Sequence, residues 1–163
     1  MSRIPTEVQV RPGSEADLEA VTVIYNHDVR ETALTFDTTA FTPAERLPWL
    51  RSHPEDGPFR LLVASHISPS DNAPEVLGHA SSSPYRPKAA YSISIEVSAH
   101  AAIAQPDEPS VRLHGAFGLR HVDTYTEEAG RKFGRHWDVS WYEKPMLSRT
   151  GPSASPVPSR TPR

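Results

Sequence analysis

Four stretches of the chain have the residue pattern of β-strands. Residues 7–11 alternate between polar and apolar side chains, and two apolar-rich runs, 59–64 and 75–80, are joined by a turn rich in Ser, Pro and Asn. Residues 91–97 give the clearest pattern, because their side chains alternate strictly. One face of this last stretch carries the apolar residues and the other the polar ones, with Tyr91, Ile93, Ile95 and Val97 opposite Ser92, Ser94 and Glu96.

Two helices are predicted in the first third of the chain. Ser14 and Asp17 have the spacing of a capping box, in which each residue satisfies a free amide of the other. The helix that follows has an apolar stripe at Leu18, Val21, Tyr25 and Val29. Thr42-Pro43 opens a second helix that runs through Leu50, with proline in the first turn where its missing N–H costs nothing. Pro48 is expected to bend or end that helix.

The last third predicts one more helix and a hairpin. Asp107 can cap a helix from Glu108 to Phe117, and Gly118 suits the left-handed conformation that ends it. Residues 121–126 and 137–142 are predicted to pair around a loop over 127–136 that is rich in Gly and charge. The resulting order β-α-α-β-β-β-α-β-β indicates a mixed α/β domain.

Proline content separates a folded unit from a tail. The chain has 17 prolines in 163 residues, and several of them lie among Ser and Arg near the C-terminus. Such a segment has almost nothing to bury. We therefore expect a folded domain over residues 7–144 and a disordered tail over 145–163.

Composition excludes several classes of protein. The chain has no cysteine, which excludes disulfides, zinc–thiolate sites and thiol nucleophiles. A net charge of -3 argues against nucleic-acid binding. No apolar run is long enough to span a bilayer, and the first residues lack the apolar segment of a secretion signal. A cytoplasmic protein is therefore expected, and the histidines show no metal-ligand spacing that would predict a metal.

Four segments, in this order along the chain, are similar to segments of one known family. They are Asn26-His27 with Phe36, Lys88 to Tyr91 followed by Glu96, residues 106–114 followed by Phe117-Gly118-Leu119, and residues 130–142. Together they resemble the phosphinothricin acetyltransferase group of the GNAT acetyltransferase superfamily, over most of residues 8–143. The resemblance implies an α/β, mixed-sheet GNAT-like acyl-CoA N-acyltransferase fold. Dimers are common in this group, so a homodimer is one assembly that the resemblance allows.

The resemblance also implies a reaction, the transfer of acetyl from acetyl-CoA to the primary amine of a small amino-acid-like substrate of the phosphinothricin or methionine sulfoximine type. The amine arrives as an ammonium ion and must lose a proton before it attacks. By resemblance the proton acceptor is Glu96, although a solvated strand carboxylate is the alternative. His114 takes the place where many GNAT enzymes have a tyrosine that protonates the departing thiolate, and a packing role is its alternative.

Binding residues follow from the same resemblance. The acceptor pocket would involve Asn26, His27, Phe36 and Tyr91, and His27 has an ordinary helix-surface role as its alternative. CoA contacts would fall where the strand ends and the next helix begins, at Ala99, His100, Ala101, Asp107 and Ser110. The cations of residues 131–135 could attract a carboxylate or phosphinate, or form a solvated hairpin tip.

The chain departs from the family at one element. After the fourth strand the family has a Gln/Arg-x-x-Gly-x-Gly/Ala loop that opens a helix, and its amides hold the CoA pyrophosphate. Here Ala101 passes directly to residues 102–106, and no glycine lies between Ala80 and His114. About 30 residues are missing relative to the family pattern, comparable to one βαβ unit. The domain is thus predicted to be incomplete near residues 101–102, with apolar surface exposed where the helix would pack.

Three interpretations remain open. The chain is an N-acetyltransferase by descent, or a non-catalytic remnant or interaction module that binds CoA poorly, or an incomplete gene product that has lost one segment. The flanks stay family-like up to the junction while one whole element is absent. This pattern favours a lost segment, because drift more often degrades a motif than removes it.

Overall fold

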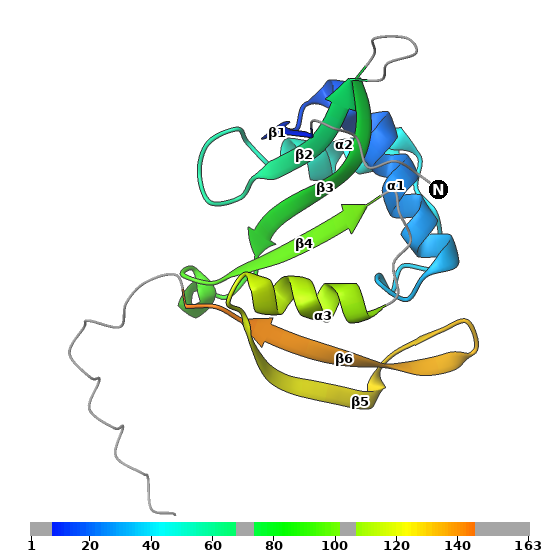
Figure 1. Ribbon diagram of the computed structural model, residues 1–163, viewed down its shortest axis with the longest axis vertical. Coiled ribbons are helices and arrows are strands. Elements are labelled where there is room, and N and C mark those ends of the chain that lie inside the picture. The colour runs from blue at the N-terminus through cyan, green and yellow to red at the C-terminus, as the bar shows by residue number, and fades with distance from the viewer. Residues whose placement is uncertain (1–7, 68–73, 102–106, 146–163) are drawn as a thin grey trace, which may run out of the picture.

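The computed structural model describes residues 8–67, 74–101 and 107–145 (Figure 1). A four-stranded sheet has the order β1-β2-β3-β4, and each neighbouring pair is antiparallel. Its strands are β1 (Gln9–Pro12), β2 (Leu61–Ile67), β3 (Pro74–Pro84) and β4 (Ile95–Ala101). Helices α1 (Leu18–Glu31) and α2 (Pro43–Arg51) lie between β1 and β2 in the chain, and helix α3 (Asp107–Ala116) follows β4. Strands β5 (Arg120–Lys132) and β6 (Arg135–Glu143) form a separate two-stranded sheet.

The predicted α/β fold class and order of elements are confirmed. Two short 3-10 turns, η1 (Glu15–Asp17) and η2 (Ala89–Tyr91), are the additions to that order. The expected mixed sheet is not what the structure has, because every strand pair in the described ranges is antiparallel. The predicted tail lies outside the described residues, apart from Pro145.

The core lies where α1 and α2 pack on one face of the sheet. Val21 of α1, Leu50 of α2 and the β2 residues Leu61 and Val63 form one cluster, and all four are at most 5% exposed. Leu61 and Val63 are two positions apart, so their side chains point to the same face. Burying each such side chain contributes about 1.5–3 kcal/mol. The core therefore fixes α1 and α2 on this face of the sheet.

A buried carboxylate confirms the predicted Ser14–Asp17 pair at the start of the helical segment. Asp17 is 4% exposed and accepts hydrogen bonds from the Ser14 amide at 2.9 Å and from the Arg11 guanidinium at 2.6 and 2.8 Å. The bonds from Arg11, and then those from Ser14, lower the pKa of Asp17 despite its burial. The ion pair thus joins β1 to η1 at the entry to α1.

Asp17→Asn should weaken folding in a pH-dependent way. A carboxyl whose folded pKa lies below its unfolded pKa stabilises the fold at pH values above the unfolded pKa, near 4, and loses that effect as pH falls through the folded value. We expect the variant to lose about 1–3 kcal/mol of unfolding free energy at pH 7 and less at pH 3. Urea denaturation at both pH values measures this. Glu15→Gln, which removes an exposed ion pair with Arg51, is the control and should change little. An equal loss at both pH values for Asp17→Asn would contradict the assignment.

Two predicted boundaries are wrong. Strand β4 begins at Ile95, because its partner β3 ends at Pro84, which pairs with Ile95. Tyr91 therefore lies in η2, and Ile93 is 90% exposed. The predicted loop 127–136 is mostly strand, since β5 and β6 meet at a two-residue turn in which Phe133 (φ 53°) and Gly134 (φ 77°) both have positive φ, as such turns require. Helix α2 runs through Leu50 as predicted and ends at Arg51, with Pro48 inside it.

The second face of the sheet is apolar and exposed. Ile95 and Val97 alternate with the residues that face α1 and α2, so they point to the opposite side, where they are 44% and 66% exposed. Val10 of β1 is also 66% exposed, and the apolar residues of α3 and its end are half exposed or more, namely Val111, Leu113 and Phe117. Among the described residues that follow Val63 in the sequence, no hydrophobic side chain is buried. The absence of a covering helix stays a prediction. The described helices include none that is both long and apolar enough to cross a membrane.

Candidate active site

A cavity of about 420 Å³ opens on the face of the sheet that α1 and α2 cover. Tyr25 of α1 and Asp37 of the following segment line it on one side, and Arg46 and Trp49 of α2 line it on another. Strands β3 and β4 supply its polar floor. The volume is that of a site for a small molecule.

The floor consists of three cross-strand pairs. In the antiparallel register of β3 and β4, Ser83 lies opposite Glu96, Ser81 opposite Ser98, and His79 opposite His100. All six residues line the cavity, because residues two apart on a strand share a face. The polar face of β4 therefore points toward the helices and the cavity, and its apolar face points away from them.

A histidine pair ends the floor next to α1. His100 Nδ1 is 2.7 Å from the carboxylate oxygen Oδ2 of Asp28, a buried residue of α1, and this contact orients the ring. The His79 ring stacks on that of His100 with centroids 5.1 Å apart. Burial, together with the nearby charges of His100 and Arg46, lowers the pKa of His79 to about 3. His79 is therefore neutral near pH 7, and the pair can carry at most the charge of His100.

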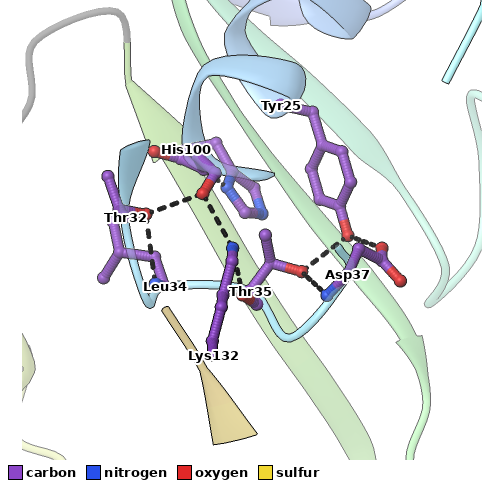
Figure 2. Close-up of polar contacts among 8 residues, drawn as sticks. Tyr25, Thr32, Leu34, Thr35, Asp37, His100 and Lys132 are labelled. Carbon is purple, nitrogen blue, oxygen red and sulfur yellow. Dashed lines mark hydrogen bonds and ion pairs between the residues drawn. The ribbon is translucent and has the colours of Figure 1, made fainter. Parts of the chain in front are cut away.

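A polar network holds the segment after α1 in place (Figure 2). Lys132 Nζ, at the tip of the β5–β6 hairpin, donates to the carbonyl oxygens of Asp28 and Thr35 at 3.1 and 2.8 Å. The Thr35 hydroxyl contacts the Tyr25 hydroxyl at 3.0 Å, and the Tyr25 hydroxyl donates to Asp37. Burial and this last bond raise the pKa of Tyr25. The hairpin tip thus fixes the wall of the cavity that carries Asp37.

Lys132 neither faces an anionic substrate nor forms part of a solvated hairpin tip, the two interpretations given above for the cations of residues 131–135. It is 4% exposed, and burial lowers the pKa of its ammonium group. Arg131 and Arg135 are exposed, and the Arg135 guanidinium lies 3.6 Å from the centroid of the Trp137 ring. Lys132 is therefore a buried structural contact rather than part of a solvated tip.

Of the predicted site residues, the structure brings Glu96 and His100 together in the cavity. Asn26 does not line the cavity, but its side-chain amide donates to the carbonyl oxygen of Phe41, a lining residue, at 2.7 Å and accepts from the Phe41 amide at 2.9 Å. The remaining predicted acceptor residues, His27, Phe36 and Tyr91, do not line the cavity. Thr35 and Asp37, the neighbours of Phe36 in the chain, do line it.

The other predicted residues whose side chains are described do not line this cavity. His114 is on α3, with its ring centroid 4.7 Å from that of Tyr142. Ala99 pairs with Ala80, and Ala101 with Gly78, at the end of β4. Asp107 and Ser110 belong to the first part of α3, and their side chains lie outside the described structure. The roles of all these residues stay predictions.

Sequence reasoning missed most of the cavity wall. Tyr25, Asp37, Arg46 and Trp49 come from segments that meet only through tertiary packing. The floor had a detectable signal, because polar residues recur at every second position at 79, 81 and 83 and again at 96, 98 and 100. This spacing predicts one polar face on each strand, but the register that pairs them is visible only in the structure.

The chain is similar to known acetyltransferases in both sequence and fold. The chain matches no protein-family model. It is 51% identical to the phosphinothricin N-acetyltransferase of Streptomyces coelicolor over 171 aligned positions, covering 86% of this chain and 97% of that protein. The structure of yncA from Salmonella typhimurium, with its cofactor acetyl-CoA, has a TM-score of 0.76 at 22% identity, covering 91% of this chain and 99% of that one. A GNAT superfamily phosphinothricin acetyltransferase from Sinorhizobium meliloti, in complex with acetyl-CoA, has a TM-score of 0.70 at 21% identity, covering 82% of this chain and 85% of that one.

The sequence match defines an N-acetyltransferase, and the structural match shows that its fold resembles that of a GNAT acetyltransferase. Within that class, the chain belongs to the phosphinothricin N-acetyltransferase family. The predicted family and enzyme class are confirmed. The cytoplasmic location and the homodimer stay predictions.

Proposed function

We propose that this chain carries the acceptor half of an enzyme that acetylates the primary amine of a small amino-acid-like substrate of the phosphinothricin or methionine sulfoximine type, with acetyl-CoA as the acetyl donor. The observation that carries the proposal is the Glu96 carboxylate on the floor of a cavity of acceptor size, in a chain 51% identical to a phosphinothricin N-acetyltransferase. A carboxylate at that place can bind the ammonium group of the substrate and accept its proton.

The residues of the floor suit this role. Glu96 is exposed to the cavity, so its carboxylate reaches the substrate directly or through one water. Ser83, opposite Glu96, and Ser98, two positions along β4, offer hydroxyl groups that can orient the amine. The Asp28–His100 pair is a second proton acceptor on the same floor, because the carboxylate fixes the ring that faces the cavity.

The residues present do not fit the diphosphate of CoA. Strand β4 ends at Ala101 and α3 begins at Asp107, so five residues connect them, none of them glycine. A run of backbone amides that cradles a diphosphate needs a glycine-rich loop leading into a helix. We therefore derive no step that depends on the bound nucleotide.

Alignment length supports the absence of one segment. The match to the Streptomyces coelicolor protein takes in 86% of 163 residues, about 140, so about 31 of its 171 positions have no residue of this chain opposite them. The apolar second face of the sheet, with Val10 and Val97 each 66% exposed, lies where a covering helix would pack. Both observations are compatible with a lost segment, which the sequence after Ala101 would place between β4 and α3.

Acetylation by a completed chain tests the proposed function. In this variant, called the completed chain below, the segment that the Streptomyces coelicolor protein carries between the equivalents of Ala101 and Asp107 replaces residues 102–106. Mass spectrometry should detect N-acetylated phosphinothricin when the completed chain is mixed with the amine and acetyl-CoA. No product with phosphinothricin, methionine sulfoximine or their close analogues would overturn the proposal.

A further inference from the structure

The cavity wall contains a buried cation in which two of the three guanidinium nitrogens have no hydrogen-bond partner among the described residues. Arg46 of α2 is 7% exposed, and its Nε and Nη2 atoms are buried without an acceptor within the described ranges. Among those residues, no carboxylate lies within ion-pair distance of it. Charged side chains are almost never buried unless they are paired. Tyr25 and the charge of Asp37 stabilise part of the Arg46 guanidinium, but Nε and Nη2 are left for an acceptor that the described chain does not supply.

Aromatic rings hold Arg46 in position. The carbon atom Cζ of its guanidinium lies 4.1 Å from the centroid of the Tyr25 ring and 3.9 Å from that of the Trp49 ring. Stacking of this kind stabilises the cation but provides no acceptor for Nε and Nη2, whose N–H groups lie in the plane of the guanidinium. That planar edge matches the two oxygens of a carboxylate or phosphinate.

The cavity is lined by both a cationic residue and carboxylate residues. Arg46 lies on the α2 wall, while Glu96 lies on the β4 floor and Asp37 on the wall after α1. A ligand with one acidic group and one ammonium group would find an opposite charge for each. A neutral amine would leave Arg46 unpaired.

We propose that Arg46 forms an anion subsite that binds an acidic group of the acceptor, a carboxylate or a phosphinate, and so selects amines that carry such a group. The inference rests on the proposed function, since it places the acceptor amine at Glu96. Arg46 is then a specificity-determining residue rather than one that takes part in proton transfer.

Calorimetric titration of the unmodified chain, without acetyl-CoA, tests the subsite. Phosphinothricin carries both acidic groups, 3-aminopropyl(methyl)phosphinic acid lacks the carboxylate, and L-norvaline lacks the phosphinate. Arg46→Gln should weaken phosphinothricin binding roughly 10- to 100-fold. The analogue that has lost the acidic group bound by Arg46 should bind weakly and respond little to the substitution. Arg51→Gln is the matched control, because Arg51 is an exposed arginine of the same helix paired with Glu15.

The outcomes separate the two proposals. If the unmodified chain does not bind phosphinothricin, the proposed acceptor site itself fails. If it binds and Arg46→Gln leaves the Kd unchanged, the anion subsite alone is overturned. If circular dichroism shows that Arg46→Gln does not fold, Arg46→Lys replaces it, since lysine keeps the charge but not the planar pair of donors. We then expect about 5-fold weaker binding of phosphinothricin, and an unchanged Kd would overturn the subsite.

Discussion

Glu96→Gln in the completed chain should lower kcat/KM for phosphinothricin acetylation by about 10²- to 10⁴-fold near pH 7. Glutamine keeps the size of the side chain and its ability to hydrogen-bond, but it cannot accept a proton from the substrate ammonium. Acetyl-CoA affinity should change little, because Glu96 lies opposite Ser83 on the floor of the cavity that is assigned to the acceptor amine. Initial rates and a calorimetric Kd for acetyl-CoA measure the two effects separately.

Two further variants locate the proton acceptor. Ser98→Ala alters the same floor without removing a carboxylate, and we expect only a small loss of rate. His100→Gln removes the ring that Asp28 orients. If Glu96→Gln retains the full rate at pH 7 while His100→Gln loses it, proton transfer belongs to the Asp28–His100 pair and Glu96 has no catalytic role.

Restoring the segment should also stabilise the fold. The second face of the sheet exposes Ile95 and Val97, and α3 ends next to Phe117, which is 63% exposed. Covering a few such side chains contributes about 1.5–3 kcal/mol each, and ordering the added residues offsets part of this gain. We expect the unfolding free energy of the completed chain to exceed that of the unmodified chain by roughly 2–5 kcal/mol.

Urea denaturation followed by tryptophan fluorescence measures this difference. The control replaces the restored segment with a Gly/Ser linker of the same length, which adds residues without an apolar face and should give no gain. Binding of a hydrophobic dye should fall in the completed chain and stay high with the linker. Equal stability of the two insertions would show that the exposed face needs no cover.

Elements governed by local chemistry were predictable from the sequence. Asp17 accepts from the Ser14 amide as the capping box predicts, and α3 ends before Gly118, which has a φ of 70°. These features depend on residues a few positions apart. The order of elements was also predictable, since the apolar spacing of each segment reports its own period.

Features set by distant partners were not predictable. The alternation of residues 91–97 is real, but β4 starts only at Ile95, where β3 offers a partner. Charged side chains are expected at the surface, but two cationic residues are buried. Arg46 lies between aromatic rings, and Lys132 donates to backbone carbonyl oxygens. The cavity depends on both the register of β3 with β4 and these buried groups, so its wall could not be read from single segments.

Titration of acetyl-CoA into the unmodified chain is the most direct test of a protein that has the acceptor side but no cradle for the diphosphate. Calorimetry should show saturable binding of phosphinothricin but, for acetyl-CoA, a Kd weaker than about 100 μM. A micromolar or tighter Kd for acetyl-CoA would show that a diphosphate site is present, since the five residues between β4 and α3 would then suffice to hold the nucleotide.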